Sequence, residues 1–376
     1  MADADPMIRP ISADSHIVEP PECFLDFIDP AFRERAPKLV TRESGRGDAY
    51  IVEGFPIELA LNTLAAAGKK PEEIKAEGDS FSAIHRSSWD PSLRLADQDA
   101  DGVGAEIIYP TIGMLICNVD DADYKNACMH AYNRWLQTYV ATDPKRLIGL
   151  GQSAIRTVAE AVEDFRRIKE MGFKGVMMPG RPATEFDYDD PQFDPLWRAS
   201  IELDLPISFH ILTSSKSGGW DNRGPYINGF QAIIRGCQDI IGMFIYSGVF
   251  MRHPALKLVC VEADAGWAPH YMYRMDHAYK RHRFWNKAME LERLPSEYFR
   301  ENVYLTFQDD YIAFRCADMV NHKRLMWASD FPHSDSTWPW SQDVIAEHTQ
   351  GLRPEQVSHS PRECSGAVQA GMTGAG

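Results

Sequence analysis

The chain has 376 residues, of which 44% are hydrophobic, 11% aromatic and 25% charged, and its formal net charge is −15. This composition predicts a soluble globular protein with a sizeable core and excludes a disordered chain. The acidic excess and the lack of a dense basic run argue against nucleic acid and membrane surfaces as partners. An enzyme that acts on a small-molecule substrate fits these values better.

The cysteines and the N-terminal segment indicate the compartment. The 7 cysteines are scattered without a CxxC pair, which is typical of free thiols in a reducing environment. Residues 1–10 contain acids and no apolar segment of a signal peptide. No stretch reaches the roughly 20 apolar residues that span a bilayer. We therefore expect a cytoplasmic protein.

Short apolar runs alternate along the chain with longer segments of helical periodicity. The predicted strands are Ile8–Ala13, Ala105–Pro110, Leu147–Gln152, Lys174–Met178, Pro206–Ile211, Leu256–Ala263, Val303–Phe307 and Arg324–Ser329. The predicted helices are Pro91–Asp101, Ala122–Thr142, Val158–Met171, Pro195–Leu203, Asn228–Gly248, Ala268–Lys287 and Asp310–Val320. This alternation predicts an α/β fold, a (β/α)8 TIM barrel formed as a single domain by residues 1–350.

The spacing of the strands predicts an insertion after the first one. About ninety residues separate the first two strands, where neighbouring barrel strands need only about thirty. Residues 20–88 are therefore predicted to form a small cap over the barrel mouth, with a strand at Ala49–Val52 and a helical stretch at Pro71–Glu77. Residues 358–376 are rich in Gly, Ser and Ala and are expected to be a disordered tail.

Asp14 and His16 lie at the end of the first apolar run. Positions i and i+2 of a strand face the same side, so both side chains would project into the barrel mouth, where TIM barrels hold their active sites. Together they would form half of a metal site. The alternative is that Asp14 caps a helix and His16 is incidental.

Two other strands also end in residues that can bind metal. His210 ends the fifth strand, and a neutral imidazole is the commonest nitrogen ligand of divalent metals; the alternative is a hydrogen-bonded structural histidine. Asp330 follows the eighth strand, where a carboxylate could bind metal, accept a proton from bound water, or do both. The alternative here is an ordinary turn rich in Asp, Ser and Pro.

Glu262 ends the sixth strand. A buried ionised carboxylate needs a partner, so this position indicates a metal, a shared proton or an arginine such as Arg181 or Arg274. Four strand ends of one barrel thus supply residue types that bind metals. These residues are Asp14, His16, His210, Glu262 and Asp330.

Several blocks, in the same order along the chain, carry a resemblance to a known family. They are Ala13–Pro20, Trp89–Val103, Phe209-His210, His253–Pro269 and Ser329–Asp335. From about Ile8 to Glu347 the chain resembles the amidohydrolase-related branch of the amidohydrolase superfamily, which includes aminocarboxymuconate semialdehyde decarboxylase and resorcylate decarboxylases. The resemblance implies a metal-dependent TIM barrel.

The resemblance also implies a ligand set. It makes Asp14 and His16 the ligands from the first strand, His210 the ligand from the fifth, and Asp330 the metal-bound acid–base. Lys174 lies early in its strand, so nothing matches the carboxylated lysine that bridges two metals in other branches, and one divalent ion is implied. Many relatives have His-x-His or Glu-x-His in the first strand. The Asp-x-His of this chain shifts the preference from zinc towards manganese, iron or magnesium.

A second ion is the alternative. Glu262 and His333, with Glu19, could hold it, and some members of the branch are dinuclear-iron oxygenases. The other role for His333 is a hydrogen bond to Asp330. The decarboxylases that the chain resembles carry a histidine near strand six, where this chain has Glu262.

The sequence therefore predicts a metal-dependent hydrolase or non-oxidative carbon–carbon lyase. Asp330 would move the proton, and Glu262 and His333 would orient water or stabilise charge. Aromatic residues near the predicted mouth favour a small aromatic or hydrophobic substrate. The alternatives are a dinuclear non-haem iron oxygenase and a non-catalytic barrel subunit of a hetero-oligomer. By analogy with the branch, we expect a homodimer.

Overall fold

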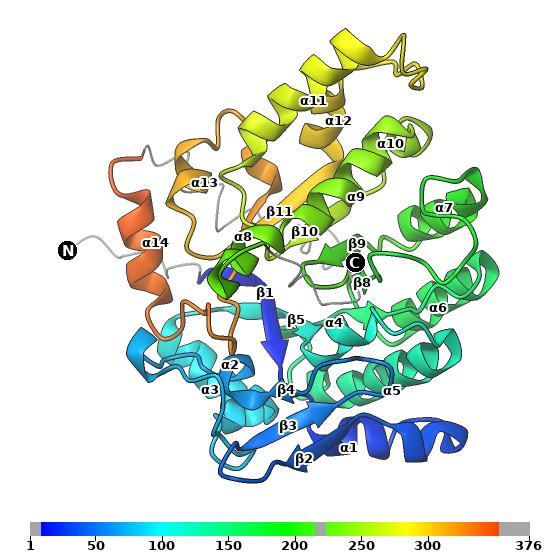
Figure 1. The fold of residues 1–376 in the computed structure, drawn as a ribbon. Coiled ribbons are helices and arrows are strands. Elements are labelled where there is room, and N and C mark those ends of the chain that lie inside the picture. The colour runs from blue at the N-terminus through cyan, green and yellow to red at the C-terminus, as the bar shows by residue number, and fades with distance from the viewer. Residues whose placement is uncertain (1–8, 215–222, 353–376) are drawn as a thin grey trace.

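The computed structural model describes residues 9–214 and 223–352 (Figure 1). Its central strands follow one another in chain order and every neighbouring pair is parallel. These strands are β1 (Ile11–Ile17), β5 (Ala105–Pro110), β6 (Leu147–Gly149), β7 (Gly151–Gln152), β8 (Val176–Met177), β9 (Ile207–His210), β10 (Leu258–Val261), β11 (Val303–Phe307) and β12 (Leu325–Trp327).

Backbone hydrogen bonds close these strands into a ring. β6 and β7 are separated only by Leu150, whose N–H donates to the carbonyl of Ile108 at 3.3 Å, so the two form one bent barrel strand. After β12, the N–H of Asp330 donates to the carbonyl of Asp14 in β1 at 3.0 Å. The fold is therefore the predicted (β/α)8 barrel.

Helices surround the barrel (Figure 1). The longer ones are α3 (Pro91–Asp101), α5 (Ala122–Val140), α6 (Val158–Glu170), α7 (Asp194–Glu202), α9 (Arg235–Tyr246), α11 (Ala268–His282), α12 (Pro295–Asn302) and α14 (Ser341–Thr349). The shorter ones are α4 (Ile112–Ile116), α8 (Gly229–Ala232), α10 (Val249–Arg252) and α13 (Tyr311–Arg315). In α6, Ala161, Phe165 and Ile168 are buried, the spacing of one helix face packed on the strands.

Several predicted elements differ from the observed ones in their bounds. The helix predicted over 310–320 forms only over Tyr311–Arg315. The first strand runs over Ile11–Ile17 rather than Ile8–Ala13, so Asp14 and His16 lie inside it; Ile8 lies outside the described residues. Polar residues continue this strand because they are buried in the barrel, which local propensity does not register. The predicted helix over 228–248 is interrupted at Ile233 and Ile234, between α8 and α9.

Residues between β1 and α3 form a separate small unit (Figure 1). It contains α1 (Pro21–Leu25), α2 (Leu61–Leu64), and an antiparallel sheet of β2 (Lys38–Thr41), β3 (Asp48–Ile51) and β4 (Leu59–Ala60). Three 3-10 turns complete it, at Pro30–Arg35, Pro71–Glu73 and Arg86–Ser88. The strand predicted at 49–52 is present as β3. The helix predicted over 71–77 was wrong, because only a three-residue 3-10 turn forms there.

This unit is joined to the barrel at the end of β12. The N–H of Ala67 donates to the carbonyl of Pro332, and the N–H of Ser334 donates to the carbonyl of Thr63, each at 3.0 Å. The tail predicted over 358–376 lies outside the described residues. Of the helices that the structure describes, none has the length and apolar character needed to cross a membrane. The described cysteines are all buried and unpaired.

Candidate metal centre

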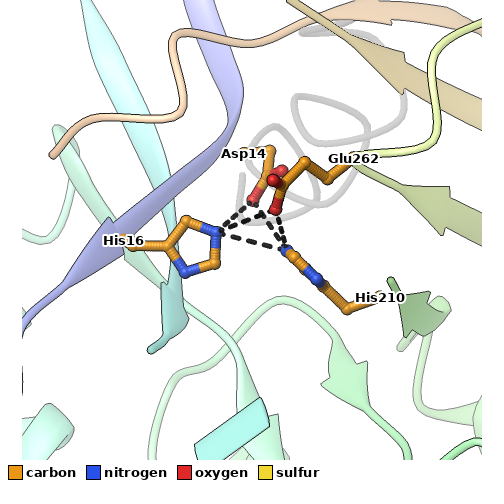
Figure 2. Close-up of side chains that lie close together, drawn as sticks. All are labelled: Asp14, His16, His210 and Glu262. Carbon is orange, nitrogen blue, oxygen red and sulfur yellow. Dashed lines mark hydrogen bonds and ion pairs between the residues drawn. The ribbon is translucent and has the colours of Figure 1, made fainter. Parts of the chain in front are cut away.

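Four side chains from three barrel strands converge at one point (Figure 2). Asp14 and His16 come from β1, His210 ends β9, and Glu262 directly follows β10. Each offers one ligand atom, and these atoms all lie within 4.8 Å of one another. The Nε2 atom of His210 lies 3.2 Å from Glu262 Oε2, and that of His16 lies 3.3 Å from Asp14 Oδ1.

A second group overlaps the first. His16 and Glu262 also lie within 4.8 Å of ligand atoms from Asp330 and His333. Asp330 Oδ1 is 3.5 Å from His16 Nε2 and 3.1 Å from His333 Nδ1. The structure therefore brings together Asp14, His16, His210, Glu262, Asp330 and His333, the candidate ligands and catalytic groups other than Glu19. Among the described residues, the ion pairs of Glu262 are with His16 and His210 and not with an arginine.

The local backbone is unusual at the two acidic strand ends. Glu262 has φ +57° and Asp330 has φ +53°, in the left-handed region that non-glycine residues rarely adopt. Such conformations cost about 1–3 kcal/mol each and cluster at functional sites. These backbone angles direct both carboxylates towards the other ligands of the centre. No sequence motif predicts them.

The carboxylates at the centre lack hydrogen-bond donors. Both oxygens of Asp14, both oxygens of Asp330 and Oε2 of Glu262 are buried, and none has a hydrogen-bond partner among the residues described. Leaving an ionised carboxylate buried and unpaired is strongly unfavourable. A bound cation would satisfy these oxygens.

The two histidines of the first group fit the same cation. His16 Nδ1 lies 2.9 Å from the carbonyl of Pro110, and His210 Nδ1 lies 3.1 Å from the carbonyl of Ile211. A carbonyl can only accept, so each Nδ1 carries a proton, and each Nε2 presents a lone pair to a cation when the ring is neutral. These two Nε2 atoms face each other across 3.2 Å. Two opposed lone pairs and orphaned carboxylates are a donor set that suits a divalent ion.

Burial controls the protonation of the histidines. It lowers the pKa of His16 to about 3, with a further contribution from neighbouring His333, and it lowers the pKa of His333 to about 3. At His210 burial also lowers the pKa, but Asp14 and Glu262 together outweigh it, and the pKa is raised. His16 and His333 are therefore neutral near pH 7, the state in which imidazole binds metal.

The carboxyl groups of the centre differ in the direction of their pKa shifts. Burial raises the pKa of Glu262, and so does the charge of Asp330; burial and the charge of Asp14 raise the pKa of Asp330. Asp14 is the exception, since His16 and His210 together overcome burial and hold its pKa below the usual range. Without a cation, burial therefore favours the protonated forms of Glu262 and Asp330, and metal binding through Asp330 would displace its proton.

Arg94 in α3 binds the backbone beside two residues of the centre, a role that nothing in the sequence indicated beyond the residue's place in a family block. Its Nε donates to Glu106 Oε2 at 2.5 Å, and both side chains are almost completely buried. Its Nη1 donates to the carbonyl of His16 at 2.9 Å, and its Nη2 to that of Phe331 at 3.3 Å. One guanidinium therefore ties the end of β1 to the loop that carries Asp330.

Glu19 is not part of the centre, so its predicted role in a second metal site was wrong. Its carboxylate accepts backbone N–H groups of Thr111, Ile112 and Gly113 at 2.9–3.3 Å, at the start of α4. Thr111 Oγ1 in turn lies 2.9 Å from His333 Nε2. Glu19 therefore fixes the loop against which His333 is oriented.

Comparisons with known proteins identify relatives of the chain. A family model described as Amidohydrolase matches residues 85–370. The chain is 26% identical over 217 residues to a 2-amino-3-carboxymuconate-6-semialdehyde decarboxylase of Dictyostelium discoideum, a match that covers 55% of this chain and 56% of that protein. The chain thus spans only about half the length of this curated relative.

Solved structures share the fold. An amidohydrolase of Mycobacterium avium subsp. paratuberculosis K-10 superposes with a TM-score of 0.77 at 20% identity, covering 96% of this chain and 99% of that one. A dihydroxybenzoic acid decarboxylase of Polaromonas sp. JS666, with bound manganese and the inhibitor 2-nitroresorcinol, superposes with a TM-score of 0.65 at 17% identity, covering 97% and 98%. With the family match over most of its length, the chain belongs to the amidohydrolase family.

Proposed function

We propose that the protein is a metal-dependent non-oxidative decarboxylase that acts on a small aromatic or conjugated carboxylic acid. The observation that carries this proposal is the opposed Nε2 pair of His16 and His210 beside the orphaned oxygens of Asp14 and Asp330. The decarboxylase names of the relative and of the manganese-bound neighbour support it. The alternative reaction on the same centre is hydrolysis of an ester, lactone or amide, and the test described below distinguishes the two reactions.

In this proposal Asp14, His16, His210 and Asp330 hold one divalent ion, and manganese, iron or zinc suits such ligands. The bound ion would supply positive charge that polarises a substrate oxygen. The bond between the carboxyl group and the ring breaks, and its electron pair stays on the ring carbon. That carbon takes a proton through Asp330, which would receive it from His333 or from bound water.

Two neighbours assist Asp330. His333 lies 3.1 Å from its Oδ1 and reaches Thr111 through the other ring nitrogen, so it can return a proton to Asp330. Glu262 stands where the related decarboxylases carry a histidine, and its raised pKa lets it donate a hydrogen bond to the substrate. Gln308, one residue past β11, adds a buried Nε2 without a partner among the described residues. This amide is suited to bind a substrate oxygen.

The test uses purified protein loaded with manganese and a panel of hydroxylated benzoic acids that includes 2,6-dihydroxybenzoate. We expect release of carbon dioxide and of the ring product in equal amounts. The matched control is Asp330→Asn, loaded in the same way and checked for fold by circular dichroism. Cleavage of aryl esters without carbon dioxide from any acid would instead assign a hydrolase.

A dinuclear oxygenase is the second candidate, favoured by the second ligand group of His16, Glu262, Asp330 and His333. One imidazole nitrogen binds only one ion, so His16 cannot serve both groups. A second ion would rest on Glu262, Asp330 and His333 alone. Metal analysis of protein purified without oxygen distinguishes the oxygenase from the decarboxylase, since the oxygenase requires two irons per chain and consumes oxygen.

We further propose that the insertion acts as a cap that shapes the substrate site. Its support is the pair of backbone hydrogen bonds to Pro332 and Ser334, next to the loop that carries Asp330. Exchange of residues 20–88 for the insertion of a related barrel should change which acids are bound while metal content stays the same. If the exchanged protein lost its metal, we would conclude that the insertion is a structural part of the barrel core instead.

We also propose a cytoplasmic homodimer. The free, buried cysteines support a reducing compartment. Tyr273, Phe284 and Trp285, on and just after α11, are 65–75% exposed and offer apolar surface that a second copy would bury. Light scattering should give twice the chain mass, and Trp285→Glu should give the monomer mass.

A further inference from the structure

Thr111 lies between β5 and α4, at the position from which α4 begins. A threonine at such a position ordinarily uses its hydroxyl to accept an N–H group of the first helical turn. The side chain of Thr111 forms no such bond, since the carboxylate of Glu19 already accepts the N–H groups of Ile112 and Gly113. The Thr111 hydroxyl is thereby left for a partner outside the helix.

That partner is His333. Thr111 is fully buried, and its Oγ1 lies 2.9 Å from His333 Nε2, the one hydrogen-bond partner of this hydroxyl among the residues described. On the other side of the ring, His333 Nδ1 lies 3.1 Å from Asp330 Oδ1. The ring also stacks on that of His16, with centroids 4.0 Å apart and planes 25° apart. The ring plane is therefore fixed, and each ring nitrogen faces one neighbour.

The single proton of the hydroxyl determines where His333 carries its own proton. If Nε2 were protonated, it would donate to the Thr111 oxygen, and the hydroxyl proton would be buried without an acceptor among the described residues, which is unfavourable. If the hydroxyl donates to Nε2 instead, both groups are satisfied. The proton of the ring then lies on Nδ1, where the carboxylate of Asp330 accepts it.

We propose that Thr111 is a positioning residue, which donates a hydrogen bond to Nε2 of His333 and so fixes the tautomer whose Nδ1 proton points at Asp330. In this tautomer neither nitrogen offers a free lone pair, so His333 is not a metal ligand and the centre holds one ion. The effect on turnover rests on the proposed decarboxylation, in which His333 returns a proton to Asp330. The tautomer itself does not depend on the reaction.

Nitrogen-15 NMR of protein with labelled histidines, loaded with diamagnetic zinc, tests the tautomer. The spectrum of His333→Gln identifies the signals of His333. We expect the wild type and Thr111→Ser to show a protonated Nδ1 and a hydrogen-bonded, unprotonated Nε2. Thr111→Val removes the hydroxyl at nearly constant volume, so the signature of a hydrogen-bonded Nε2 should disappear.

The same variants are compared in the decarboxylation assay after metal analysis. Thr111→Val should lower kcat about tenfold, the effect of one lost hydrogen bond, and leave KM within about twofold. Its metal content should remain one ion per chain. Thr111→Ser is the matched control, because it keeps the hydroxyl, and its kcat should stay within about threefold of the wild type.

Each other outcome has a defined meaning. A proton on Nε2 of His333 in the wild type would overturn the proposal, and so would two ions per chain with His333 bound to one of them. An unchanged His333 signal in Thr111→Val, or an equal loss of turnover in Thr111→Ser, would show that the hydroxyl does not position the ring. If the expected tautomer is found in a protein that decarboxylates no acid, the proposed function fails and the assignment of Thr111 stands.

Discussion

His16 and His210 point their Nε2 atoms at each other across 3.2 Å, while each Nδ1 donates to a backbone carbonyl. Neither ring can turn its proton inwards without losing that carbonyl bond. When both rings are neutral, the pair presents two opposed lone pairs that a cation would satisfy, whereas without a cation Asp14 and Glu262 favour a protonated His210. This arrangement of the two rings explains why the barrel holds the Asp14 carboxylate between them without a hydrogen-bond donor.

Metal removal should destabilise the protein. Manganese at 100 times its dissociation constant would raise the free energy of unfolding by about 2.7 kcal/mol, and a chelator should abolish that increment. His210→Ala should reduce bound metal from about one ion per chain to near zero, as measured by plasma mass spectrometry. His270→Ala, at an exposed position of α11, is the control and should keep full metal content. Equal metal in both variants would remove His210 from the centre.

Asp330→Asn should reduce turnover without changing the fold. Asparagine keeps the size of the side chain but cannot donate an acidic proton, so the rate of the proposed reaction should fall by about 10²–10⁴-fold. The circular dichroism spectrum should not change. Because Asp330 is also a proposed ligand, metal content is measured on the same sample. A rate that stays within threefold of the wild type at full metal loading would exclude Asp330 as the acid.

Arg94→Met should be strongly destabilising. It would leave Glu106 as a buried carboxylate without its cation and would release the carbonyls of His16 and Phe331. Breaking a buried pair on one side costs about 3–5 kcal/mol, measurable by urea unfolding. Arg86→Met breaks the exposed Arg86–Asp90 pair and should cost less than about 1 kcal/mol.

The double variant Arg94→Met/Glu106→Gln adds a check on this explanation. Removing the second charge should recover part of the loss, because the uncompensated carboxylate is then gone. If the double variant is as unstable as the sum of the two single variants, the ion pair does not account for the effect.

The sequence was sufficient for the order of the barrel strands and for the residues of the centre. His210, Glu262 and Asp330 each follow an apolar run, and a parallel barrel must bring such positions to one end. The sequence could not show how these side chains are held. The left-handed backbone at Glu262 and Asp330 depends on loop packing, and the role of Arg94 depends on a contact with Glu106, twelve residues away and in another element. Glu19 was misplaced for the same reason, since its backbone partners lie more than ninety positions along the chain.

Glu19 should make stability depend on pH. It is fully buried, and burial raises its pKa to about 7 despite three backbone hydrogen bonds. Below about pH 4.5 the carboxyl is protonated in both folded and unfolded chains, so it has no effect. Between about pH 4.5 and 7 the unfolded chain loses the proton while the folded chain keeps it. The free energy of unfolding should therefore fall across this window, by about 3 kcal/mol in total, and level off above it.

Glu19→Gln isolates this contribution, because glutamine has nearly the same shape and does not titrate. The other titrating groups, including those of the metal centre, are common to both proteins and cancel in the difference. Urea unfolding at pH 5 and pH 8, with chelator present throughout, should show the wild type losing more stability than Glu19→Gln as the pH rises. Parallel pH profiles would mean that the three N–H donors of Thr111, Ile112 and Gly113 keep Glu19 ionised in the folded chain. In that case the start of α4, rather than burial, would set the charge of the residue that positions the loop beside His333.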